Sequence, residues 1–123
     1  MKLSTLKKKL NQVAKSATAL SLSRGKRLSS ITKHLREVVR KVVKNDGEVV
    51  TIATEMEDEL TKMGIRWKKK DEAVFQKGRS WELWVWYEVD IGVKGTTEIV
   101  LKIDGKERKV CQADVRWGWQ KIN

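Results

Sequence analysis

The stretch that most constrains the fold reads WELWVWYEVDI and runs from Trp81 to Ile91. Successive side chains of a β-strand point to opposite faces, and here a regular apolar series occupies every second position. That series comprises Trp81, Leu83, Val85, Tyr87, Val89 and Ile91. An isolated strand or hairpin is marginal in water, so a strand this apolar needs partner strands and a covering layer. The stretch therefore predicts a sheet with another element packed on one face.

The flanking sequence supplies partner strands. A short candidate lies at 65–68 and another at 97–103, and the second ends in Asp104-Gly105, a dipeptide that favours a tight hairpin turn. A return strand is predicted from 107 to 119. Its apolar face would hold Cys111, Ala113, Val115, Trp117 and Trp119. Together these segments predict a Trp-rich antiparallel sheet of three to four strands.

The first 45 residues predict two basic helices. Apolar residues at alternating spacings of three and four form one stripe over 3–20 and a second over 28–42. The phase of this pattern slips near Gly25, which disfavours a helix interior by about 1 kcal/mol, and Ser23 is a candidate N-cap for a new helix. A helical hairpin over 1–45 is therefore expected, with a homodimer seam through the same stripes as an alternative.

A third helix is predicted after the basic region. Asp46 would cap its beginning, Gly64 would end it in the left-handed conformation, and its outer side is acidic. One face would contain Val49, Ile52, Met56, Leu60 and Met63. The expected fold class is α+β, with two basic N-terminal helices, a third helix and the antiparallel sheet. Residues 46–123 would form one compact unit with the hairpin.

Positive charge is concentrated at the N-terminal end. The chain has 123 residues, with 27 Lys and Arg against 16 Asp and Glu, which gives a net charge of +11. Residues 1–45 hold 13 basic residues and one acid, a charge of +12, whereas 46–123 hold 14 basic and 15 acidic residues. Such a basic segment is suited to polyanions, whose binding weakens steeply as salt rises.

These features predict a non-catalytic protein that binds DNA or RNA, mainly through phosphates. Lysines outnumber arginines 19 to 8, which favours backbone attraction over base reading. A second candidate patch, residues 67–70, places an aromatic ring beside lysines and could stack on an unpaired base. In the alternative interpretation, Trp67 closes the edge of the core and the lysines protect a sheet edge. The expected nucleic-acid-binding residues are Lys7, Lys8, Lys9, Lys15, Arg24, Lys26, Arg27, Lys33, Arg36, Arg40, Lys41, Lys44, Trp67, Lys68, Lys69 and Lys70.

Trp84 and Trp86 favour a different function. They lie on the strand face opposite the apolar series and alternate with carboxylates, which repel phosphates. The rings therefore suit a protein-binding patch, since Trp is enriched in interface hot spots, or a surface on which the basic helices dock. The alternative function is a small protein-interaction module, such as a viral inhibitor or accessory factor. It would act on an acidic protein surface or on a nucleic-acid-handling enzyme.

Catalytic signatures are scarce, and we expect no cofactor and no metal. The single cysteine, Cys111, excludes an internal disulfide and is expected in the core. The order of helix, strand ending at Asp90 and strand ending in Asp104-Gly105-Lys106 is similar to that of the PD-(D/E)xK nucleases. This resemblance implies two acids around a metal ion. No proline precedes Asp90, and Asp104-Gly105 is more typical of a turn, which leaves a metal-dependent nuclease as a remote alternative.

No window approaches the roughly 18 apolar residues that a transmembrane helix needs. This pattern predicts a soluble or peripheral protein. A basic hairpin lying on anionic lipid is disfavoured, because its apolar stripe has few aromatic residues to anchor in the interface. We expect no membrane partner and an intracellular protein, either cytoplasmic or in the nucleoid or nucleus.

Overall fold

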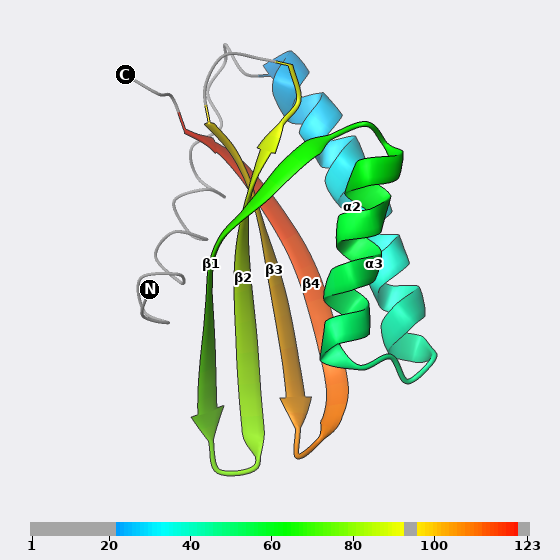
Figure 1. The fold of residues 1–123 in the computed structure, drawn as a ribbon, viewed down its shortest axis with the longest axis vertical. Coiled ribbons are helices and arrows are strands. Elements are labelled where there is room, and N and C mark those ends of the chain that lie inside the picture. Colours follow the sequence, from blue (N-terminus) through cyan, green and yellow to red (C-terminus); the bar gives the residue numbers. More distant parts are fainter. Residues whose placement is uncertain (1–21, 93–95, 121–123) are drawn as a thin grey trace.

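A computed structural model of the chain describes residues 22–92 and 96–120 (Figure 1). Its strands form one sheet of order β1-β2-β3-β4, and every neighbouring pair is antiparallel. The α+β class and the antiparallel sheet are thereby confirmed, with four strands. The elements are α2 (Leu22–Lys44), α3 (Val49–Lys62), β1 (Arg66–Lys77), β2 (Ser80–Asp90), β3 (Thr96–Lys106) and β4 (Lys109–Gln120).

Helices α2 and α3 pack on the same face of the sheet and against each other (Figure 1). Helix α2 follows the edge strand β4, and α3 leads into the opposite edge strand β1. The predicted apolar face of β2 is buried here through Val85, Tyr87 and Val89. The other buried apolar residues of this core are Leu28, Leu35, Val39, Ile52, Met56, Leu60, Ile65, Ile91, Ile99, Leu101, Ile103 and Val115. One face of the sheet thus carries both helices.

The predicted break near Gly25 is wrong. Helix α2 is already formed at Leu22 and continues through Ser23 and Gly25 to Lys44. Leu28 and Leu35 are fully buried against the sheet and α3. Burial of two such side chains contributes about 3–6 kcal/mol, which outweighs the cost of one helical glycine. The first predicted helix, over 3–20, lies outside the described residues.

The predicted cap at Asp46 is also wrong, whereas the end of this helix was predicted well. Helix α3 begins after Glu48, whose side chain makes no capping hydrogen bond within the described structure. Asp46 lies in the preceding turn with a φ of +57°, and its N–H donates to Val43 O at 3.1 Å. Gly64 has a φ of +73°, as a left-handed helix stop requires. Asp46 therefore belongs to the end of α2.

Strand boundaries differ at two places. Strand β1 runs to Lys77, whereas the prediction ended at residue 68. The prediction stopped short because β1 is an edge strand with mostly exposed side chains and lacks a clear apolar alternation. The hairpin turn predicted at Asp104-Gly105 is wrong, since β3 continues to Lys106 and the left-handed residue of the turn is Glu107, with a φ of +59°. The turn, Glu107-Arg108, therefore lies three residues later than predicted.

Cys111 is exposed, which contradicts its expected place in the core. The register between β3 and β4 shifts at Asp104/Gly105, where Asp104 pairs with Gln112 and Gly105 with Val110. This irregularity leaves Cys111 without a partner residue in the β3–β4 register, and Val110 packs against the core in its place. A bulge of this kind reverses the facing of side chains on one side of it.

Candidate nucleic-acid interface

Among the side chains that the structure describes, four cations occupy the outward face of α2. Lys33, Arg40, Lys41 and Lys44 are exposed, because they recur on the side of the helix opposite the buried residues Leu28 and Leu35. None of the four forms an ion pair with any part of the chain that the structure describes. We call these four residues the α2 ridge.

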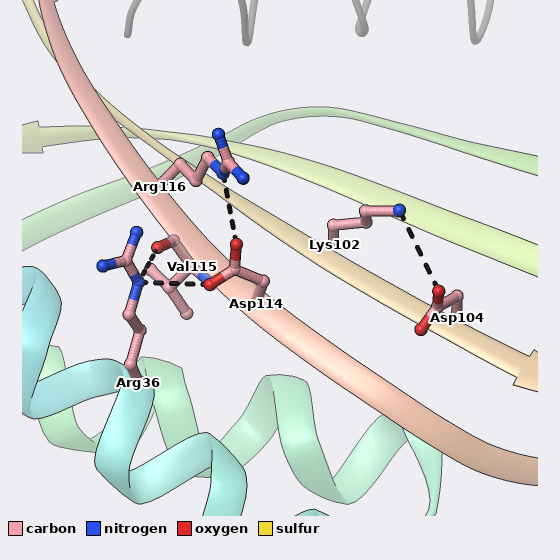
Figure 2. A network of polar contacts seen from close by, with 6 residues as sticks. All are labelled: Arg36, Lys102, Asp104, Asp114, Val115 and Arg116. Atoms are coloured by element: carbon pink, nitrogen blue, oxygen red, sulfur yellow. Dashed lines mark hydrogen bonds and ion pairs between the residues drawn. The ribbon is translucent and has the colours of Figure 1, made fainter.

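Two other expected phosphate ligands instead fasten α2 to the sheet. Arg27 Nη1 donates to Ile91 O at 2.6 Å. Arg36 Nε donates to Val115 O at 2.6 Å and lies 3.1 Å from Asp114 Oδ1 (Figure 2). The other carboxylate oxygen of Asp114 accepts from Arg116 Nε at 3.1 Å. Asp114 is thus shared between two guanidinium groups.

Replacing Arg36 with alanine is expected to lower the free energy of unfolding by about 2 kcal/mol, the typical worth of a charge-assisted hydrogen bond in a partly buried site. The change also leaves Val115 O at the sheet edge without its donor. Urea unfolding followed by circular dichroism measures the loss. An equal loss in Lys33→Ala, where the side chain is exposed and has no ion pair with the described residues, would contradict the structural role of Arg36.

The remaining expected phosphate ligands either are not described by the structure or lie on β1, away from the α2 ridge. Lys7, Lys8, Lys9 and Lys15 lie outside the described residues, and the side chains of Arg24 and Lys26 are likewise not described. Residues 67–70 lie on β1, beyond α3, whose side chains include Glu55, Glu57, Asp58 and Glu59. The structure therefore does not join the 67–70 patch to the α2 ridge.

Trp67 contacts the core at its edge and remains 37 % exposed. Its Nε1 donates to Thr61 Oγ1 at 3.0 Å, and its ring meets Tyr87 edge-on with centroids 5.9 Å apart. Lys69 and Lys70 pair with Glu72 and Glu88 at 3.5 and 3.4 Å. Strand β1 is an edge strand, so the lysines lie along an edge of the sheet, where charge opposes strand pairing with other molecules.

Trp84 and Trp86 face away from the two described helices. Trp84 is only 5 % exposed, its Nε1 donates to Glu82 Oε2 at 3.0 Å, and Lys102 Nζ lies 5.6 Å from its ring centroid. Trp86 is half-buried beside it. The expected docking of the second basic helix on these rings is wrong, because α2 packs on the other face. The expected docking of the first basic helix concerns residues outside the described ranges.

A hydrogen bond links α2 to the acidic helix α3. His34 Nε2 lies 2.6 Å from Glu59 Oε1, and this contact lowers the pKa of the Glu59 carboxyl below its ordinary value of 4.5. In α3, burial instead raises the pKa of Glu57. A carboxyl with a lowered pKa stabilises the fold above its ordinary pKa, and this contribution is lost as pH falls through the lowered value.

Replacing His34 with alanine is expected to return the pKa of Glu59 towards 4.5, because the carboxylate loses its hydrogen-bond donor. The contribution to stability that is lost as pH falls through the lowered pKa of Glu59 should therefore become smaller. Carbon-detected NMR titration of the Glu59 carboxyl measures the shift. His34→Gln, which retains a donor, is the control and should keep the pKa lowered. No change in His34→Ala would disprove the assignment.

Asp90 and Asp104, the acids of the nuclease alternative, lie near opposite ends of the sheet. Glu82 pairs with Asp104, so Asp90 stands eight residues farther along β2, which is about 27 Å at 3.4 Å per residue. These two carboxylates cannot share a metal ion. Within the described ranges no cluster of three or more His, Cys, Asp or Glu residues could hold one. No helix in those ranges is long and apolar enough to span a membrane.

Two hollows lie between the helices and β4, and the sequence did not reveal them. The first, which we call the α2–β4 hollow, has a volume of about 360 Å³ and is lined by Arg40, Val43, Lys44, Cys111, Gln112, Ala113 and Asp114. The second, of about 660 Å³, is lined by Asp46, Gly47, Glu48, Val49, Val50, Arg108, Lys109 and Val110. The β4 wall depends on the register shift, which no local sequence signal specified.

No family model, curated protein or solved structure matches this chain. Its function is therefore inferred from the residues and their geometry.

Proposed function

We propose that this protein is a non-catalytic nucleic-acid-binding protein that holds phosphates on the α2 ridge. The observation that carries this proposal is the absence of ion pairs between the ridge and the described carboxylates. Internal pairing of these cations with the protein's own carboxylates would have removed the case for a polyanion. Arg27 and Arg36 are used internally, yet Lys33, Arg40 and Lys44 remain exposed.

The length and charge of the ridge support this function. Lys33 and Lys44 are eleven residues apart on one helix, which corresponds to about 16 Å. A nucleic-acid duplex carries one charge per about 1.7 Å of its axis, so a ridge of this length faces several phosphates. Glu37 is the only acid in α2. The acidic helix α3 on one flank favours a nucleic acid that follows α2 towards β4.

Salt dependence tests the proposal directly. Binding of labelled single-stranded and duplex DNA and RNA is measured by fluorescence anisotropy at 50 and 200 mM salt. Four phosphate contacts predict a slope of about −3.6 in log K against log salt, or a loss of roughly 100-fold over this range. No binding at 50 mM, or an affinity that does not change with salt, would refute the proposal.

A second candidate function, the protein-interaction module, is favoured by an exposed apolar residue on β1. Val74 is 67 % exposed near the end of this edge strand. We infer that a partner protein with an apolar contact patch would bind there. A pull-down repeated after nuclease treatment tests this function. A partner retained by the native chain and lost in Val74→Ser supports it, whereas loss of every partner on nuclease treatment would count against it.

A further inference from the structure

The α2–β4 hollow combines cationic, polar and apolar groups within about 360 Å³. That volume lies within the range of small-ligand sites, roughly 300–1,000 Å³. Arg40 and Lys44 contribute two cations from α2, and Gln112 contributes an amide from β4. Val43 and Ala113, both half-buried and in contact with the core, contribute apolar surface.

Asp114 lines the hollow, but its carboxylate is already paired. Both oxygens of that carboxylate are engaged, one with Arg36 and the other with Arg116, each at 3.1 Å (Figure 2). Arg40 and Lys44 have no ion pair within the described part of the chain. The local charge available to a ligand is therefore that of two cations.

We propose that the α2–β4 hollow seats one nucleotide of a single-stranded nucleic acid. This inference rests on the proposed function and adds its substrate class. The phosphate lies against Arg40 and Lys44, the base lies against Val43 and Ala113, and the Gln112 amide hydrogen-bonds the base edge. An amide has two donors and an acceptor, so it tolerates different bases. Bases within a duplex are stacked and paired, and reaching such a hollow would cost the energy of unstacking.

Cys111 provides a reporter for this site in the native chain. It is exposed, it lines the hollow, and it is the only cysteine in the sequence. The rate of alkylation by iodoacetamide is measured alone, with a twelve-nucleotide single-stranded oligothymidylate, and with a duplex of equal length. Both nucleic acids are used at concentrations that anisotropy shows to be saturating. We expect the single strand to slow alkylation at least fivefold and the duplex to slow it less than twofold.

Each outcome of the alkylation experiment bears on the nucleotide site or on the proposed function. If the single strand binds but leaves the alkylation rate unchanged, the hollow is not its seat, and the proposed function stands. If both nucleic acids protect Cys111 equally, the preference for single strands is refuted. If neither binds at 50 mM salt, the proposed function fails together with this inference.

A pair of matched substitutions separates the hollow from general charge. Gln112→Glu places a carboxylate in the hollow, and Gln76→Glu makes the same change on exposed β1. We expect Gln112→Glu to weaken single-strand binding at least fivefold and Gln76→Glu to weaken it less than twofold. Both residues are exposed, so both variants should fold. Equal effects of the two changes would overturn the inference.

Discussion

Replacing all four residues of the α2 ridge with alanine is expected to reduce nucleic-acid affinity at 50 mM salt by 100-fold or more. Each lost phosphate contact removes about 0.9 from the slope of log K against log salt. The slope should therefore become shallower by three to four units. Fold stability should change little, because Lys33, Arg40, Lys41 and Lys44 are exposed and make no ion pairs with described residues.

A second quadruple variant controls for net charge. Alanine at Lys62, Lys77, Arg79 and Lys106 removes the same number of cations from exposed places outside the ridge. If the ridge holds the phosphates, this control should lower affinity less than tenfold and leave the slope nearly unchanged. Equal losses in both variants would show that binding follows total charge and not the position of the cations.

Much of the fold was predictable because burial imposes a period on the sequence. The alternation in β2 requires one buried face, and Val85, Tyr87 and Val89 form it. The spacing of Ile52, Met56 and Leu60 likewise predicted the buried stripe of α3. Where a strand is not buried, the same reasoning fails. Most of β1 is exposed, so apolar residues are not required at every second position. The length of β1 could therefore not be predicted from the sequence pattern.

The wrong predictions at Gly25 and Asp46 have a common cause. Local propensities are worth about 1 kcal/mol, and packing between elements is worth more. Gly25 suggested a helix break, but α2 is held by its buried leucines and by Arg27 and Arg36. Asp46 suggested a helix cap, but it occupies the left-handed position that follows α2.

The candidate site was predictable in its charge and not in its geometry. Helical spacing alone separates the outward cations of α2 from its apolar stripe. It does not show which arginines reach the sheet, because that depends on the placement of β4. Arg36 was expected to bind phosphate, whereas its Nε contacts Val115 O and Asp114. The α2–β4 hollow depends on the same placement and on the register shift that exposes Cys111.

Gly105 offers the sharpest test of that register. It is buried in β3, and a methyl group there would collide with Lys109 O and with the ring of Trp81. The ring is held in place, since Trp81 Nε1 donates to Glu107 O at 2.8 Å. Gly105→Ala is therefore expected to lower the free energy of unfolding by about 3 kcal/mol through overpacking. Urea unfolding followed by far-ultraviolet circular dichroism measures this loss.

The control is Gly78→Ala in the β1–β2 turn. Gly78 has a φ of +59° with open space around its Cα, so alanine there meets only the left-handed backbone penalty, about 1–2 kcal/mol. If Asp104-Gly105 were the hairpin turn, both substitutions would cost the same. A double-mutant cycle extends the test: Trp81→Ala should relieve part of the collision, so the Gly105→Ala loss should be smaller in that background. Equal losses in the two backgrounds would place Trp81 away from Gly105 and contradict the observed register.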